Sequence, residues 1–326
     1  MNNTIKFFIS EINKGERLDL FLTNKLENLT RSYIKKLIED NKVKINNIVV
    51  NSAAKKLKIN DYILVNLIKK TSKKLEPKKI RLDIVYEDKD LLIVNKQKGM
   101  VVHPGAGNFQ NTLANALAHR YKKNLSDING ELRPGIIHRI DKETSGLLVV
   151  AKNNYTHSEL GKQFSRHSIK RKYLCLIWGI IRPLSGRIET FIARNRKNRQ
   201  LMTVSEIAGK NAITNYKTIK VFTIKNVPKL SLLECELETG RTHQIRVHLN
   251  YRGTSILGDK QYGKGKLKFK NIDSNFLQKL NNLKGQALHA KILGFDHPTK
   301  KKYVQFESNL PPDFEKMIDF LNKLSG

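Results

Sequence analysis

Residues 136–152 constrain this chain most, because a polar loop there leads directly into a short apolar run. The loop carries Arg139 and Asp141, and residues 144–146 form a turn signal before the apolar residues 147–151. An apolar run of this length predicts a buried strand, which would hold the loop with little positional freedom. The loop either presents Asp141 for chemistry, or Arg139 and Asp141 form an ordinary surface ion pair of little energetic value.

Length and charge narrow the class of protein. A chain of 326 residues with 39% apolar residues predicts a folded protein with two domains, or with one large and one small domain. The net charge of +32 and the pI near 10.0 favour a polyanionic partner, either nucleic acid or an anionic membrane surface. Lysine, asparagine and isoleucine are used heavily throughout, so a biased codon pool could supply part of the lysine excess.

The cysteines and the apolar segments indicate the compartment. Cys175 and Cys235 each lie in an apolar, strand-like run, which predicts buried free thiols in a reducing compartment. No CxxC spacing suggests zinc. The sequence has no apolar stretch of about 18 residues, and residues 1–12 lack the pattern of a signal peptide. We therefore expect a soluble, cytoplasmic protein without a membrane span.

Residues 1–75 are predicted to form a small domain, which residues 69–79, rich in lysine, link to the rest of the chain. Two short helices come first, and Thr30 or Ser32 is expected to cap the second. Asparagines at 41, 46 and 47 mark turns between short strands, because asparagine tolerates the left-handed backbone.

This order of elements resembles the S-four-type RNA-binding domain. The resemblance implies that cations along the second helix and the next strand contact RNA; these are Arg31, Lys35, Lys36, Lys42 and Lys44. A generic small α+β domain with solvated lysines is the alternative reading.

Residues 76–326 are predicted to form a second domain in which short strands alternate with few helices. Residues 173–179 form an apolar strand directly after the basic run 170–172. Residues 194–203 predict a hairpin-like insertion whose cations suit phosphate contact, or else a flexible charged loop.

A second polar motif occupies residues 240–248, after an alternating strand. His243, Gln244 and Arg246 are expected to lie close together where a turn enters a helix. His243 and His248 are five residues apart, but their cation-rich neighbourhood and the absence of an acidic third ligand argue against a metal. Arg246 is better suited to hold an anion or a carboxylate.

Three ordered motifs together resemble the RluA family of pseudouridine synthases, most closely its RluD-type members. They are residues 95–105, residues 138–146 and residues 240–248. The resemblance covers nearly the whole chain. It implies an α+β protein in which the small N-terminal α/β RNA-binding domain is followed by a catalytic domain with a mainly antiparallel, mixed sheet. Gln97 departs from the family pattern, which has proline at this position.

The resemblance also implies roles for single residues. Asp141 would be the catalytic aspartate, Tyr173 would pack against the target base, Arg246 would pair with the aspartate, and Arg139 would help to displace the uridine from its stack. The reaction needs one ionised carboxylate beside a flipped nucleotide, and no cofactor or metal. The carboxylate could attack the ribose or the base, or abstract a proton from the sugar.

The RluD-type likeness implies large-subunit (23S) ribosomal RNA as substrate, in the stem-loop that contacts the decoding region. Expected partners are this RNA, the large ribosomal subunit or its precursor, and the protein is expected to be a monomer. Three alternatives stay open: a catalytically inactive ribosome-assembly protein, a synthase acting on other RNA such as tRNA, and a hydrolase that uses Glu143 as a second carboxylate.

Overall fold

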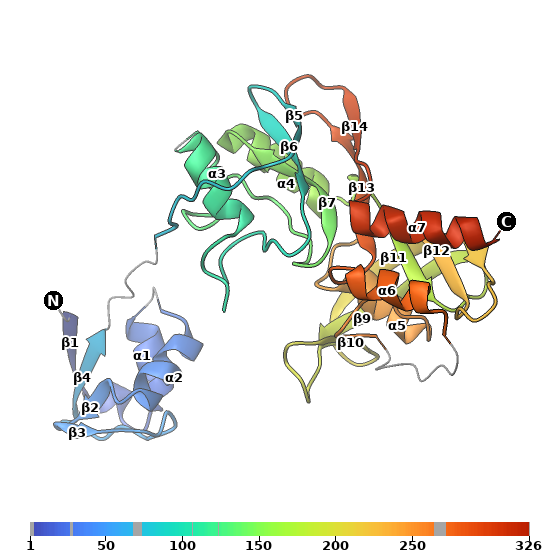
Figure 1. Ribbon diagram of the computed structural model, residues 1–326. Helices are drawn as coiled ribbons and strands as arrows, with labels where there is room; N and C mark the ends of the chain where they lie inside the picture. Colours follow the sequence, from blue (N-terminus) through green and yellow to red (C-terminus); the bar gives the residue numbers. More distant parts are fainter. Residues whose placement is uncertain are drawn as a thin grey trace. The chain divides into compact units, whose positions relative to one another are not determined.

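The computed structural model describes residues 3–26, 29–67, 74–105, 107–122, 124–263 and 272–325. The chain divides into two compact units, Met1–Lys73 and Lys74–Gly326 (Figure 1). Residues 69–73 of the predicted linker lie outside the described residues. No described helix is long and apolar enough to cross a membrane.

The first unit packs two helices against a four-stranded antiparallel sheet with the order β1-β4-β2-β3. Its elements are β1 (Asn3–Phe8), the 3-10 helix η1 (Glu11–Asn13), α1 (Leu18–Lys25), α2 (Arg31–Glu39), β2 (Val43–Ile45), β3 (Ile48–Val49) and β4 (Tyr62–Leu67). Thr30 caps α2 by accepting a hydrogen bond from the backbone N–H of Tyr33, as predicted. Strand β1, which pairs with β4, was not predicted.

The predicted asparagine turns are present in this unit. Asn41, Asn46 and Asn47 have φ angles of 59°, 51° and 67°, in the left-handed region that asparagine tolerates. The turn at Asn46 and Asn47 joins β2 to β3. The apolar face of α2, formed by Ile34, Leu37 and Ile38, is buried in the core of the unit.

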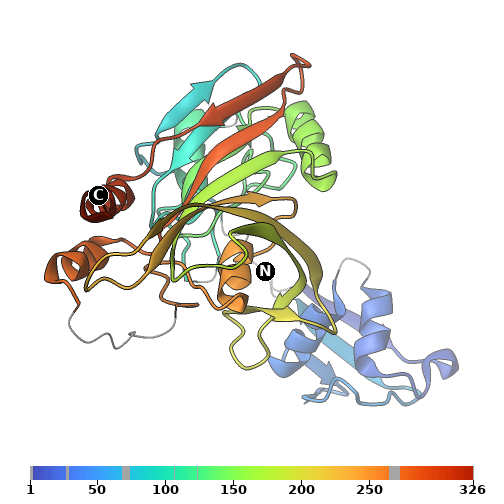
Figure 2. The ribbon, with the colours of Figure 1, turned by 90° about the vertical axis from the view of Figure 1, so that its right-hand side faces the viewer.

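The second unit is built on a ten-stranded sheet with the order β10-β9-β11-β12-β8-β13-β7-β6-β5, and β14 pairs with β13 outside this path (Figure 2). The strands are β5 (Ile84–Glu87), β6 (Leu91–Lys96), β7 (Ser145–Ala151), β8 (Lys170–Trp178), β9 (Ser185–Arg194), β10 (Met202–Ser205), β11 (Lys210–Phe222), β12 (Leu230–Leu237), β13 (Leu288–Asp296) and β14 (Tyr303–Glu307). Every neighbouring pair is antiparallel except β13 and β7. The predicted mainly antiparallel, mixed sheet is therefore confirmed.

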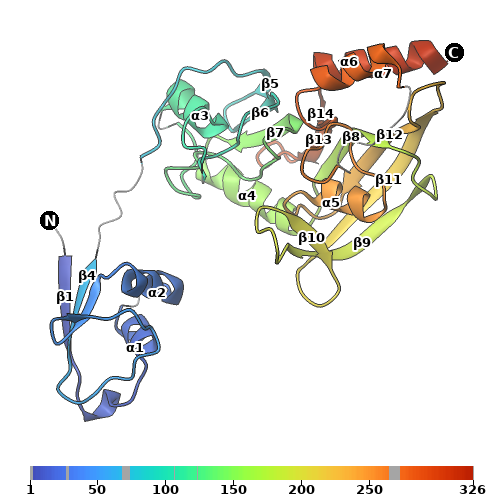
Figure 3. The same ribbon diagram turned by 60° about the horizontal axis from the view of Figure 1, so that its bottom comes forward.

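The helices of this unit are α3 (Leu113–Tyr121), α4 (Asn154–Ser165), α5 (Gln244–Tyr251), α6 (Ser274–Asn282) and α7 (Pro312–Ser325). Helix α5 lies against β10 and β11, and α6 packs beside α7 (Figure 3). The spacing of apolar residues predicts helices over residues 112–121 and 158–166, which correspond to α3 and α4, and the 240–248 motif predicts α5. Neither α6 nor α7 is predicted.

Strand β7 is buried over its whole length, as the apolar run predicts. Its alternate residues enter two separate cores: Leu148 and Val150 face the core that contains α3, whereas Leu147 and Val149 face the core that contains α4. Packing on both faces leaves the strand little freedom, so the loop that precedes it has a rigid support. In β8 and β12, Cys175 and Cys235 are buried free thiols, as predicted.

Substitution of Gly146, at the start of β7, should cause a large loss of stability. A Cβ atom there would lie 2.6 Å from the backbone nitrogen of Ala290 in β13, and the φ angle of 113° disfavours other residues. We expect Gly146→Ala to lower the free energy of unfolding by about 2 kcal/mol or more. Urea unfolding followed through Trp178, the single tryptophan, measures this loss.

Gly161 in α4 provides the matched control, because a Cβ atom there meets no atom within 4 Å. Gly161→Ala should stabilise the unit by up to about 1 kcal/mol. Equal effects of the two substitutions would contradict this account of the β7–β13 junction.

Candidate active site

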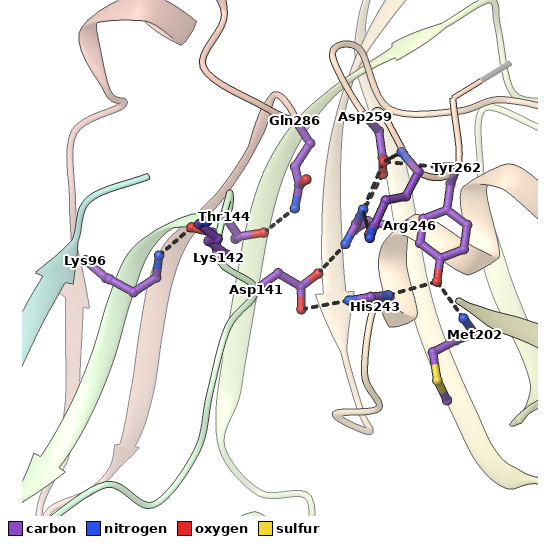
Figure 4. A network of polar contacts seen from close by, with 11 residues as sticks. Lys96, Asp141, Lys142, Thr144, Met202, His243, Arg246, Asp259, Tyr262 and Gln286 are labelled. Atoms are coloured by element: carbon purple, nitrogen blue, oxygen red, sulfur yellow. Dashed lines mark hydrogen bonds and ion pairs between the residues drawn. The ribbon is translucent and has the colours of Figure 1, made fainter. Parts of the chain in front are cut away.

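Asp141 lies in a tight turn that ends where β7 begins. The backbone N–H of Thr144 donates to the carbonyl of Asp141 (3.1 Å) and so closes the turn. The Thr144 hydroxyl accepts a hydrogen bond from Gln286 (2.9 Å), which ties the end of the turn to the segment before β13 (Figure 4). The turn that carries Asp141 is thus closed by its own backbone and tied at its end to a second segment, as expected of a loop anchored on a strand.

Lys96 anchors the same turn from β6. Its ammonium group donates to the carbonyls of Gln97 and Met100 (both 2.9 Å) and of Lys142 (3.1 Å), and its side chain is 1% exposed. Burial lowers the pKa of Lys96 to about 7, although the carboxylates of Asp141 and Glu143 act in the opposite direction. Lys96 belongs to the 95–105 motif, but nothing in the sequence indicates its role.

Arg246, in the first turn of α5, joins Asp141 to a second carboxylate. Its Nη1 lies 3.0 Å from Oδ2 of Asp141, while its Nε and Nη2 bind the two oxygens of Asp259 at 2.7 and 2.9 Å (Figure 4). Nη2 also donates to Gln261 (2.8 Å), and the ring of Tyr262 lies 4.9 Å from the guanidinium carbon. Burial disfavours the charge of Arg246, but the two carboxylates outweigh it and raise its pKa.

Asp259 is the fixed partner of this arginine. Burial by itself would raise the pKa of Asp259, but the hydrogen bonds from Arg246 and from two backbone N–H groups hold that pKa below its ordinary value. Its side chain is fully buried, whereas that of Asp141 is 18% exposed. Arg246 therefore presents Asp141 to solvent while Asp259 stays inside.

His243 lies on the other side of Asp141. It precedes α5 in the left-handed conformation (φ 57°), with its Nε2 3.9 Å from Oδ1 of Asp141 and its Nδ1 2.8 Å from the hydroxyl of Tyr262. That hydroxyl accepts the backbone N–H of Met202, so the simplest bonding gives its own proton to Nδ1. The imidazole proton then lies on Nε2 and faces Asp141. Burial lowers the pKa of His243, which favours this neutral form.

Two cavities of about 580 and 700 Å³ meet at Asp141. Arg139, Asp141, His243 and Arg246 line both of them, and Tyr173 lines the first. The four predicted site residues Arg139, Asp141, Tyr173 and Arg246 therefore come together. Tyr173 is 7% exposed, and burial raises the pKa of its phenol, so the hydroxyl keeps its proton at neutral pH.

Arg139 does not pair with Asp141. Its Nη1 lies 3.3 Å from Nε2 of His103, whereas Asp141 pairs with Arg246 and faces the neutral imidazole of His243. The surface ion pair left open by the sequence is thus excluded. Arg139 is exposed at the junction of the cavities, where it can reach a ligand.

One group of residues among those described could hold a metal by distance: Asp88, Asp90 and His297. The Asp88 carboxylate already binds the ammonium group of Lys300 (2.9 Å) and the hydroxyl of Tyr86 (2.8 Å). The positive charge beside this carboxylate therefore comes from a lysine. These residues line neither cavity at Asp141.

The cations predicted to bind RNA lie in two places. In the first unit, Lys35 and Lys36 are exposed and Lys42 and Lys44 are half-buried, whereas Arg31 is held by Asp19 at 2.8 Å. In the second unit, β9 and β10 pair across residues 195–201, as the hairpin-like insertion predicts. Met202 of this hairpin contacts Tyr262, which places the hairpin beside the site.

Comparison with known proteins decides the family. A family model described as RNA pseudouridylate synthase matches residues 90–251, and the S4 (S-four-type) domain matches residues 16–63. An "Uncharacterized RNA pseudouridine synthase" of Bacillus subtilis is 42% identical over 98% of this chain and 99% of its own length. A "Ribosomal large subunit pseudouridine synthase D" of Zymomonas mobilis is 44% identical over 94% of each chain.

The chain belongs to the RNA pseudouridylate synthase family. It is an RNA pseudouridine synthase with an N-terminal S4 domain, as the motifs indicate. The solved structure of human RNA Pseudouridylate Synthase Domain Containing 4 has the same fold, with a TM-score of 0.56 and 24% identity over 74% of this chain and 93% of its own. A hydrolase that uses Glu143 is inconsistent with this membership.

The buried Lys96 of the synthase predicts a pH dependence of stability. The folded protein releases the Lys96 proton near pH 7, whereas the unfolded chain retains it up to its ordinary pKa of 10.5. The unfolded state thus binds more protons between these values, and stability must rise with pH there. The free energy of unfolding of the wild type minus that of Lys96→Met should increase above about pH 7, by at most about 1.4 kcal/mol per pH unit.

Urea unfolding followed through Trp178, from about pH 6 to about pH 9.5, checks this difference. Subtracting the variant removes the titration of other groups. A difference that stays constant over this range would show that folding does not lower the pKa of Lys96, and a difference that falls would show that folding raises it.

Proposed function

We propose that this synthase converts uridines of large-subunit (23S) ribosomal RNA into pseudouridine, with Asp141 as the catalytic carboxylate. One observation carries the assignment: Asp141 is the only carboxylate among the described residues that lines both cavities. The ion pair with Arg246 fixes the orientation of its Oδ2. Its remaining oxygen surface faces the space that a flipped nucleotide would occupy.

The proposed reaction is an isomerisation, so the residues at the site have only to bind, orient and move protons. The bond between N1 and the ribose breaks, the uracil turns, and C5 bonds to the ribose; C5 then releases a proton and N1 gains one. In this proposal the ring of Tyr173 supports the base, and Arg246 keeps the carboxylate in place. Arg139, exposed and free of Asp141, occupies the space from which the uridine is withdrawn.

The RNA target is proposed from the relatives and from charge. The Zymomonas mobilis relative is named for the ribosomal large subunit, and the net charge of +32 suits a large polyanion. The S4 domain would add phosphate contacts through Lys35, Lys36, Lys42 and Lys44, with Arg31 positioned by Asp19. One chain carries both the RNA-binding domain and all the site residues, which supports action as a monomer on ribosomal RNA, the large subunit or its precursor.

The test uses ribosomal RNA from cells that lack this protein. We expect the wild type to form pseudouridine at defined uridines of 23S RNA, and Asp141→Asn to lower the rate by roughly 10³-fold or more while RNA affinity changes by less than about threefold. Chemical mapping of pseudouridine and a filter-binding assay measure the two quantities.

Asp296→Asn, which alters an exposed carboxylate outside both cavities, is the control and should keep full activity. Normal product from pure Asp141→Asn protein would refute the role of Asp141. Tight RNA binding without product from the wild type would instead support a ribosome-assembly protein. In a parallel reaction with tRNA from the same cells, product in tRNA but not in 23S RNA would move the substrate to tRNA.

A further inference from the structure

Arg171 is a buried cation that the proposed chemistry leaves unused. It lies in β8, is 7% exposed, and lines the first cavity together with Asp141. Burying a guanidinium costs several kcal/mol unless a carboxylate compensates it. Arg171 forms no ion pair among the described residues, and burial lowers its pKa.

Neutral groups hold the guanidinium of Arg171. Its Nη2 donates to the carbonyls of Leu237 (3.3 Å) and Glu238 (3.1 Å), and the ring of Phe164 lies 5.5 Å from its central carbon. Its Nε is buried and has no hydrogen-bond partner in the described part of the chain. Buried donors are rarely left unpaired, so the described residues do not complete the hydrogen bonding of this guanidinium.

The backbone makes room for this guanidinium. A Cβ atom on Gly240 would lie 2.7 Å from Nη1 of Arg171. Two carbonyls and an aromatic ring already fix the guanidinium, so a Cβ atom at position 240 would displace the guanidinium from these partners. The glycine at position 240 therefore leaves the space that the guanidinium of Arg171 occupies.

The cavity around Arg171 has an excess of positive charge. Arg139, Arg171, Arg241 and Arg246 line it, against the single carboxylate of Asp141 among its lining residues. Arg246 is compensated by Asp259, but Arg171 is not. Residues two apart on a strand project from the same face, so β8 presents Arg171 and Tyr173 to the same space, about 6.6 Å apart along the strand.

We propose that Arg171 binds the phosphodiester next to the target uridine, with its guanidinium donating to a non-bridging oxygen of that phosphate. This inference rests on the proposed function, since it assumes that Tyr173 supports the flipped base. The ligand is a phosphate monoanion of the RNA backbone, which supplies the compensating charge that the protein lacks. Arg171 is thus a substrate-binding residue that holds the nucleotide by its backbone, independently of the base.

The test is a chemical double-mutant cycle on a synthetic stem-loop containing a uridine that the wild type modifies. Each phosphate flanking that uridine is replaced in turn by an uncharged methylphosphonate, with the preceding ribose 2′-deoxy in charged and uncharged RNA alike. At one of the two positions the replacement should lower the wild-type kcat/KM by about 10- to 100-fold. Arg171→Met should show a similar loss on charged RNA and less than about a twofold further loss on the uncharged RNA.

Two further variants complete the design. Gly240→Ala, which displaces the guanidinium without removing it, should also lose its sensitivity to the methylphosphonate, and it serves if Arg171→Met fails to fold. Arg187→Met alters an exposed arginine paired with Glu189 and Glu238, and it should keep the full sensitivity. If the loss caused by Arg171→Met and the loss caused by the methylphosphonate multiply at both phosphate positions, the proposal is overturned. Arg171 then has a structural role only.

The two proposals fail in different ways. Absence of pseudouridine from the wild type on the charged RNA refutes the proposed function. Dissociation constants for the same RNAs then still report on the phosphate site, because coupling between Arg171 and the phosphate appears in binding without turnover. Full turnover with no coupling at either phosphate refutes only the role of Arg171.

Discussion

The guanidinium of Arg246 is the interaction on which the site depends. It binds Asp259 with two hydrogen bonds and Asp141 with one, so the buried carboxylate of Asp259 fixes the arginine, and the arginine fixes the partly exposed carboxylate of Asp141. Buried ion pairs contribute little net stability, because desolvation offsets their attraction. Their value here is geometric: Asp141 is held where two cavities meet, at the start of a strand buried on both faces.

The rest of the second unit supports this geometry from opposite sides. Lys96 holds the carbonyl of Lys142 from β6, Gln286 holds Thr144 from the segment before β13, and α5 supplies both Arg246 and its neighbour His243. Segments far apart in the sequence thus converge on one turn because β13 runs parallel to β7 and pairs with β8 on its other side. In the proposed function, this convergence serves the chemistry, whereas the S4 domain adds RNA affinity.

Local patterns predicted the parts of the fold that depend on nearby residues. The buried strand after the 136–146 loop, the cap at Thr30 and the asparagine turns were all readable, and α7 was missed although Phe314, Met317 and Leu321 have helical spacing. The contact between Asp141 and Arg246 spans 105 residues, so only the family resemblance could predict it. Lys96 and Asp259 were missed because their roles come from burial, which a lysine-rich sequence does not reveal.

The central claim, that Asp259 positions Asp141 through Arg246, is tested most directly by the kinetics of Asp259→Asn on ribosomal RNA. Loss of the second carboxylate frees the guanidinium to turn, and kcat should fall by up to about 10²-fold while KM changes by less than about threefold. Asp88→Asn, which alters a paired carboxylate outside both cavities, should leave kcat unchanged. A correctly folded Asp259→Asn protein with wild-type kcat would contradict the account.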